Sequence, residues 1–199
     1  MADRTNGDEA VPPGWSYSPS SWGQRLPIVG LATLGFAIAM YLALYQWRVI
    51  GHVWEPFFGS GSEHILRETW VSRLLPVPDA FLGAMGYFAD AVAGVIGGTR
   101  RWRTMPWIVI IFGLLVGPFG LISILLVLSQ PLLFGTYCTL CLASALISVL
   151  MIWPAMDEML ASLQHLKRRR DAGDSLWRAI WGLSTDVSSA GSTQTAAMK

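Results

Sequence analysis

Two cysteines, Cys138 and Cys141, are the residues of this 199-residue chain whose type and spacing point most directly to chemistry. In a helix, positions i and i+3 lie on one face, so the two sulfurs are close enough to form a disulfide after a modest adjustment. The free N–H groups at a helix start stabilise a thiolate at Cys138, and Cys141 lies about 4.5 Å deeper along the axis. Such a pair is suited to relaying two electrons between a soluble dithiol and a lipid-soluble carrier.

Other uses of the pair follow from the same composition. A structural zinc site needs four ligands, and the sequence contains no further cysteine. The three histidines, His52, His64 and His165, lie outside the long apolar stretches, which argues against a haem held by intramembrane histidines. Cysteines in apolar helices also act as small hydrophobic residues. The spacing alone is equally compatible with redox use and with structural use.

Four apolar stretches are expected to position this pair within a membrane. The chain is 53% hydrophobic and 14% charged, whereas soluble domains carry about a quarter charged residues. A bilayer core about 30 Å thick needs roughly 20 apolar helical residues to cross. Three uncharged runs have this length, and a Gly- and Ala-rich fourth is the weaker candidate: 26–47, 106–128 and 132–153, with 80–98 as the fourth. We therefore expect an all-α membrane protein built as a four-transmembrane-helix bundle, with both cysteines opening the last span.

Basic residues support the count of four spans and give an orientation. Arg100, Arg101 and Arg103 follow the second span, and residues 167–170 follow the fourth. With four spans both clusters fall on one side, and cytoplasmic loops carry the excess of Lys and Arg. The expected protein is multi-pass in a bacterial cytoplasmic membrane, contacts lipid, and has both termini in the cytoplasm. The net charge of +1 leaves no basic face for nucleic acid.

The chain divides into four predicted regions. Residues 1–25 form a disordered cytoplasmic tail, 26–153 the transmembrane domain, 154–183 cytoplasmic or interfacial helices beginning at Pro154, and 184–199 a second disordered tail. Polar and small residues dominate both tails.

The loop between the first two spans, residues 48–79, is the longest segment expected on the outer side. Residues 62–75 are predicted to form an interfacial helix capped by Ser62. Its apolar residues are suited to lying on the membrane surface: Ile65, Leu66, Trp70, Val71, Leu74 and Leu75. This segment is either a simple connection or a lid over whatever the bundle binds.

The second span has a seam of small and polar residues on one helical face: Gly83, Tyr87, Asp90, Gly94 and Gly97. Small residues allow helix backbones to approach closely inside a membrane. Asp90 is an ionisable group within a span, and such groups face the bundle interior. It is either a structural carboxylate or part of a proton relay.

Residues 26–153 resemble the vitamin K epoxide reductase family, whose bacterial members act in disulfide formation. The shared features are four spans, a long outer loop after the first, the block Pro76-Val77-Pro78-Asp79-Ala80-Phe81-Leu82-Gly83 leading to Tyr87, and the cysteine pair opening the fourth span. The resemblance implies a quinone pocket, for ubiquinone or menaquinone, enclosed by the bundle near its outer surface.

Roles for individual residues follow from this resemblance. Cys141 would react with the quinone, and Cys138 would exchange with an incoming thiol or disulfide. Asp79 would lie near the quinone carbonyl, and Gly83 and Tyr87 complete the implied quinone site. Ala145 replaces a tyrosine that some members carry four positions after the second cysteine.

The outer loop departs from the family pattern because it lacks the two cysteines that usually shuttle electrons to the membrane pair. We expect a quinone-dependent thiol-disulfide oxidoreductase in which an extracytoplasmic thioredoxin-like partner meets Cys138 directly. The alternative is a non-catalytic membrane module that retains the fold for binding or assembly. A transporter, based on Asp90 and its glycine-rich span, ranks third.

Overall fold

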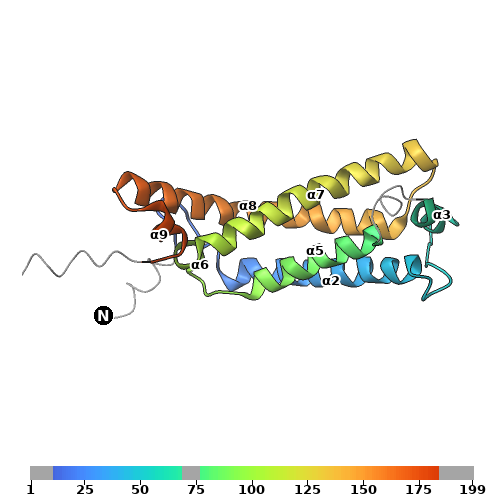
Figure 1. Ribbon diagram of the computed structural model, residues 1–199, viewed down its shortest axis with the longest axis horizontal. Helices are drawn as coiled ribbons and strands as arrows, with labels where there is room; N and C mark the ends of the chain where they lie inside the picture. The colour runs from blue at the N-terminus through green and yellow to red at the C-terminus, as the bar shows by residue number, and fades with distance from the viewer. Residues whose placement is uncertain (1–10, 69–76, 184–199) are drawn as a thin grey trace, which may run out of the picture.

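The computed structural model describes residues 11–68 and 77–183, and every regular element within these ranges is a helix. Four helices lie side by side along the long axis (Figure 1): α2 (Trp22–Gln46), α5 (Asp79–Val95), α7 (Pro106–Phe134) and α8 (Thr139–Asp171). The short helix α3 (Gly61–Glu68) lies at one end of the molecule, and α6 (Arg101–Thr104) and α9 (Leu176–Ile180) lie at the other. The predicted all-helical character is confirmed.

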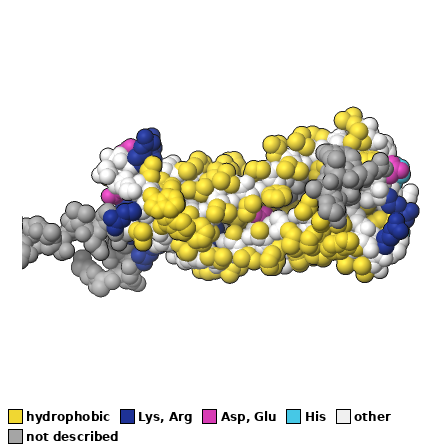
Figure 2. All heavy atoms as spheres, in the orientation of Figure 1, with side chains coloured by type: hydrophobic (Ala, Val, Ile, Leu, Met, Phe, Trp, Pro, Cys, Tyr) yellow, Lys and Arg dark blue, Asp and Glu magenta, His cyan; other side chains and the backbone are white. Residues whose placement is uncertain are grey.

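Three of the long helices, α2, α7 and α8, are long and apolar enough to cross a membrane. Figure 2 shows hydrophobic side chains covering the middle of the molecule, with Lys and Arg gathered toward its ends. The fourth helix, α5, has 17 residues, and at 1.5 Å per residue it is about 26 Å long. It packs against α2 and α7, and a fourth membrane crossing by α5 stays a prediction.

The boundary between the last two long helices differs from the predicted one. Residues 132–134, expected to open the fourth span, instead end α7, and Gly135 follows in the left-handed conformation with φ 65°. This conformation is favourable for glycine and terminates the helix. Pro154, expected to begin a new segment, lies inside α8, which continues to Asp171. The two helices are therefore longer than their apolar runs.

Part of the predicted N-terminal tail is ordered. The indole of Trp15 donates to Gln164 (3.0 Å), and the hydroxyl of Tyr17 donates to Asp157 (2.6 Å), both on α8. These hydrogen bonds, with a third from Ser20 to Glu158, hold residues 15–20 against α8, although Pro, Gly and Ser are frequent in residues 1–25. Residues 1–10 and 184–199 of the predicted tails lie outside the described residues, as do Trp70, Val71, Leu74 and Leu75 of the outer loop.

The end of the bundle opposite α3 contains a buried charged network. Arg25, Arg101 and Glu158 are each 0% exposed. Arg101 forms a salt bridge with Glu158, and its guanidinium also donates to the carbonyl of Ala93 (2.5 Å). Arg25 donates to the carbonyl of Gly94 (2.9 Å). Because the last carbonyls of a helix lack intrahelical partners, the two arginines complete the end of α5 and join it to α2, α6 and α8.

This network gives Arg101 a partner that the sequence does not show. Arg101 belongs to the basic cluster predicted after the second span, and it is fully buried and paired with Glu158. An ionised group in an apolar environment is retained only with a partner. Sequence spacing does not reveal that partner, since the two residues are 57 positions apart.

The core between the four long helices combines large and small side chains. Its buried members are Ile28, Ala32, Ala39, Ala84, Tyr87, Phe112, Val116, Ile147, Met151 and Ala155. A Cβ atom at Gly35 would lie 2.6 Å from the ring of Tyr87, and one at Gly94 would lie 2.6 Å from Val29. These glycines allow α2 and α5 to approach closely, as expected for small residues in a membrane bundle.

Candidate functional site

The two cysteines form a disulfide at the start of α8, with their Cα atoms 5.2 Å apart. Cys138 is the N-cap residue of the helix, and its sulfur accepts a hydrogen bond from the N–H of Cys141 (3.1 Å). The pair is therefore positioned by the helix start, as the i, i+3 spacing indicated.

The two sulfurs have different surroundings. Cys138 is 0% exposed, and its backbone N–H donates to the side chain of Gln130 (3.2 Å) on α7. Cys141 is partly buried and lines a cavity inside the bundle. Cys138, which was expected to meet a partner directly, is fully buried, and the outer loop contacts the residues on both sides of it, Tyr137 and Thr139.

A carboxylate of the outer loop forms hydrogen bonds with the first residue of the disulfide helix. Glu55 accepts hydrogen bonds from the backbone N–H of Thr139 (2.9 Å) and from the Thr139 hydroxyl. The Ser62 hydroxyl also donates to it, as do the N–H groups of Phe57 and Phe58 (both 3.3 Å). Burial alone raises the pKa of Glu55, but the hydrogen bonds from Ser62 and Thr139 outweigh it and lower the pKa to about 2. The carboxylate is therefore ionised at neutral pH.

The loop also packs directly on the residues that precede the disulfide. The ring of Phe58 lies 5.4 Å from that of Tyr137. Gly61, the first residue of α3, contacts the same segment so closely that a Cβ atom there would overlap the carbonyl of Tyr137 and the side chain of Thr136. Ser62, predicted as the cap of this helix, instead donates to Glu55, and the helix begins one residue earlier.

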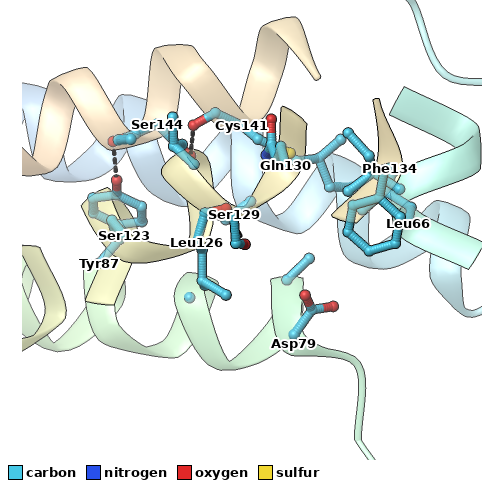
Figure 3. Close-up of a pocket in the computed structure, with 17 residues that line it drawn as sticks. Leu66, Asp79, Tyr87, Ser123, Leu126, Ser129, Gln130, Phe134, Cys141 and Ser144 are labelled. Carbon is cyan, nitrogen blue, oxygen red and sulfur yellow. Dashed lines mark hydrogen bonds between the residues drawn. The ribbon is translucent and has the colours of Figure 1, made fainter. Parts of the chain in front are cut away.

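The cavity beside Cys141 has a volume of about 140 Å³ and is lined by α2, α3, α5, α7 and α8 (Figure 3). Most of its wall is apolar, with Leu42, Ile65, Leu66, Leu126 and Phe134 among the lining side chains. Polar groups are few: Asp79, Tyr87, Ser123, Ser129, Gln130 and Ser144. The structure thus brings together four of the five residues singled out in the sequence, namely Cys141, Asp79, Gly83 and Tyr87, and leaves Cys138 outside the cavity wall.

Asp79 is held at one end of this cavity by Gln46 of α2. The amide of Gln46 donates to the Asp79 carboxylate, and its carbonyl oxygen accepts the backbone N–H of Ala80 (3.2 Å). Asp79 lies in the first turn of α5, where a negative charge complements the helix dipole. The same Gln46 amide donates to the carbonyl of Leu66 (3.3 Å), which links this end of the cavity to α3.

Tyr87 lies at the other end of the cavity (Figure 3). Its hydroxyl donates to the carbonyl of Ser144 (2.5 Å) and shares a hydrogen bond with the Ser148 hydroxyl (2.7 Å). The Ser144 hydroxyl in turn donates to the carbonyl of Cys141 (2.9 Å). Tyr87 therefore holds the first turns of α8, while its ring forms part of the cavity wall.

A smaller cavity of about 30 Å³ continues beyond Tyr87, and Asp90 lines it together with Ser123 and Ser148. The Asp90 side chain is 5% exposed, and one of its oxygens has no hydrogen-bond partner within residues 11–68 and 77–183. A water molecule needs roughly 10–15 Å³ of such space, so this chamber has room for about two.

The larger cavity fits an aromatic-sized ring. A cavity of about 150 Å³ lined by apolar side chains accepts benzene, and this one has about 140 Å³. Gly83 leaves its wall open, since a Cβ there would meet only Ala39 within 4 Å. The described residues contain no cluster of His, Cys, Asp and Glu that could hold a metal ion.

Sequence reasoning missed Glu55, Gln46 and Gln130. Gln130 lies between two apolar runs, where it was assigned to the connection between spans, yet it belongs to α7 and lines the cavity. A polar residue directly after a long apolar run was the feature of the sequence that could have identified Gln130 as a site residue. No comparable signal marked Glu55, because its partner on α8, Thr139, is 84 positions away.

Comparison with known proteins identifies a family. The family model of the vitamin K epoxide reductase family matches residues 26–156. No curated protein and no solved structure matches the chain significantly. The matched region contains the four long helices' apolar parts, the outer loop and both cysteines.

Proposed function

The chain belongs to the vitamin K epoxide reductase family, and on that premise we propose that it is a multi-pass membrane thiol oxidoreductase that couples its Cys138–Cys141 pair to a quinone. The observation that carries the proposal is the placement of Cys141. It is one half of a disulfide and lines an apolar cavity of about 140 Å³ that also contains Asp79 and Gln130.

The proposed reaction oxidises an extracytoplasmic dithiol protein. A thiolate of the partner attacks the sulfur of Cys138, the Cys138–Cys141 bond breaks, and the partner's second thiol completes its own disulfide. The two cysteines are left reduced, with two electrons gained. The Cys138–Cys141 disulfide would re-form by passing two electrons and two protons to a quinone held beside Cys141. The sum is partner dithiol plus quinone giving partner disulfide plus quinol.

The lining residues have separate tasks in this proposal. Two side chains would form hydrogen bonds with the polar edge of a quinone ring. They are Asp79, which Gln46 holds in place, and Gln130. Ile65 and Leu66 of α3 close the outer side of the cavity and keep water out, so α3 acts as a lid. Tyr87 holds Ser144 and thereby the turn that contains Cys141.

The proposed orientation follows the basic residues. We take α5 as the fourth crossing, which places the clusters at 100–103 and 167–170 in the cytoplasm with both termini. The disulfide then lies on the extracytoplasmic side, where oxidised cysteine pairs persist.

The partner must displace the loop before it reaches Cys138. Because the described loop residues include no cysteine, the partner's own thiolate has to arrive at a buried sulfur. Trp54 and Phe57 flank Glu55 and are 61% and 76% exposed. We propose these two aromatic side chains as contacts for a thioredoxin-like partner.

The proposal is tested by following the thiols in isolated membranes. Isolated membranes are treated with a reductant, which is then removed, and a short-chain ubiquinone or a short-chain menaquinone is added. The remaining free thiols are alkylated, and the modified protein is analysed by mass spectrometry. We expect the quinone to oxidise the free thiols of Cys138 and Cys141 to the disulfide, so that they are no longer alkylated, and the more effective quinone identifies the acceptor class. Thiols that stay reduced with both quinones contradict the proposal.

A second candidate, a non-catalytic assembly module, is favoured by the burial of Cys138 and by the lack of loop cysteines. The double replacement of Cys138 and Cys141 by serine separates the two functions. A module keeps its cellular role in this variant, whereas an oxidoreductase loses it.

A further inference from the structure

Glu55 places a negative charge at the N-terminus of the helix that carries the redox pair. Its carboxylate accepts the backbone N–H of Thr139, the first residue of α8, at 2.9 Å, and it also accepts the Thr139 hydroxyl. A helix N-terminus stabilises one anion well, through its free N–H groups and its dipole. In the disulfide form, Glu55 is the anion that takes this position.

Reduction creates a competitor for the same helix end. Cys138 is the N-cap residue, and its sulfur already faces the N–H of Cys141 (3.1 Å). A thiolate at Cys138 and the Glu55 carboxylate would then be two negative charges flanking one residue, Thr139. Like charges at this separation destabilise each other, more strongly where water is scarce.

Other charged side chains of the described loop and of α3 do not reach this helix end. Glu63 pairs with His52 (2.6 Å) and Arg67 (3.6 Å), and His64 lies 3.8 Å from Glu68. The α7 side chain that contacts Cys138 is the uncharged Gln130. Glu55 is thus the charged group with direct hydrogen bonds to residue 139.

We propose that Glu55 is a positioning residue that destabilises the Cys138 thiolate and thereby keeps the reduction potential of the Cys138–Cys141 pair low. The proposal rests on the redox use of the pair and adds a regulation of that site. A low potential means that the disulfide form is favoured and that the reduced pair gives up its electrons readily. This is the reverse of strongly oxidising pairs, whose reduced form is stabilised.

The redox step can be written for both protonation states. When both thiols are neutral, the disulfide takes up two electrons and two protons; when Cys138 ionises, it takes up two electrons and one proton. Each proton fewer changes the pH slope of a two-electron potential by about 30 mV per pH unit. Glu55 should hold the pair in the two-proton regime.

The test compares Glu55→Gln with Glu63→Gln, which removes a lid carboxylate that does not contact α8. The full-length protein in lipid nanodiscs is equilibrated with glutathione redox buffers from mildly acidic to mildly alkaline pH, and the disulfide fraction is read by alkylation and mass spectrometry. For Glu55→Gln we expect about tenfold easier reduction, which is a potential about 30 mV higher. The difference should widen as the pH rises, and Glu63→Gln should match the unaltered protein.

The pH slope separates this role from a merely structural one. A loop that is only loosened by Glu55→Gln exposes Cys138 to reagents faster but leaves the equilibrium potential and its slope unchanged, and that result overturns the proposal. If Glu55→Gln does not accumulate, Glu55→Asp and Thr139→Val replace it. Glu55→Asp keeps the charge and should keep the low potential. Thr139→Val removes one of the two hydrogen bonds that hold the carboxylate at the helix end, so the charge can move away and the potential should rise. A higher potential in Glu55→Asp than in Thr139→Val counts against the proposal.

Failure of this inference is distinguishable from failure of the proposed function, because the buffer contains glutathione and no quinone. If Glu55→Gln shifts the potential but the protein does not react with quinone, the inference is supported and the proposed quinone coupling is contradicted. If the protein reacts with quinone but Glu55→Gln leaves the potential unchanged, the proposed function is supported and the inference is contradicted.

Discussion

Single residues decide what the cavity beside the disulfide can hold. Cys141, Asp79 and Gly83 come from two different helices and converge on one space. Gly83 has a separate task from the other two, since it supplies room rather than a functional group. A side chain at this position would extend into the cavity without displacing a neighbour.

This leads to a prediction for Gly83→Leu. The leucine should fill the cavity and abolish quinone-dependent oxidation of the pair, reducing the rate by tenfold or more, or about 1.4 kcal/mol. Stability should not fall, because glycine inside a helix costs about 1 kcal/mol relative to better helix formers. The rate of quinone reduction and the unfolding midpoint in detergent check this.

The matched control is Gly30→Leu on α2, where no atom lies within 4 Å of the added Cβ. It should keep full activity. A Gly83→Leu variant as active as Gly30→Leu would place the quinone elsewhere.

At the scale of elements, the outer loop and α3 form a cover held by a few polar contacts. Glu55 fastens the loop to α8, and Gly61 lets α3 lie directly on the segment before Cys138. Charge-assisted hydrogen bonds of this kind contribute about 1.5–3 kcal/mol each. The cover is therefore stable, yet its hydrogen bonds are few enough for a docking protein to displace.

We predict that Gly61→Val pushes α3 away from the disulfide. Its Cβ would overlap the Tyr137 carbonyl, and the displaced loop should lose a hydrogen bond between Glu55 and Thr139. Such a charge-assisted bond contributes about 1.5–3 kcal/mol, so the fraction of molecules with an open loop should rise about tenfold or more. Reduction of the disulfide by dithiothreitol should accelerate accordingly. Gly51→Val, in the same loop but with open space around it, should leave the rate unchanged, and equal rates for both variants would show that α3 does not control access.

The elements themselves were largely predictable from sequence, and their contacts were not. Apolar runs located the long helices because bilayer thickness fixes their length. Their ends were misplaced where a helix continues past its apolar part, as at Pro154 and at residues 132–134. Cys141 was named from its spacing to Cys138, Gly83 and Tyr87 from the seam of the second span, and Asp79 through the resemblance. The structure brings all four to one cavity. Glu55 was not found, because a loop carboxylate has no periodicity that reveals a distant partner.

At the scale of the whole molecule, the two ends are fastened differently. The end opposite the disulfide is joined by Arg25, Arg101 and Glu158, all fully buried, and by Ser20, whose hydroxyl donates to Glu158 (2.5 Å). The disulfide end is closed by a loop. A rigid base and a displaceable cover suit a protein that must admit a partner at one end only.

The rigid base gives a prediction for Glu158→Ala. Removing this carboxylate leaves Arg101 charged and buried without its ion-pair partner, which should destabilise the protein by about 3–5 kcal/mol. The adjacent Asp157→Ala, which removes the hydrogen bond with Tyr17, should cost about 0.5–1.5 kcal/mol. Unfolding by SDS titration in mixed micelles measures both, and similar losses for the two variants would argue against a structural role for the buried pair.

The covering of Cys138 has a further consequence for selectivity. Cys138 is 0% exposed, and Cys141 is partly buried and lines the cavity between the helices. Small thiols should therefore reach either sulfur only slowly, when the loop opens. Under the proposed function, a protein that binds the loop strongly enough to move it would have the advantage, and the cover would limit the flow of electrons from small thiols to the quinone.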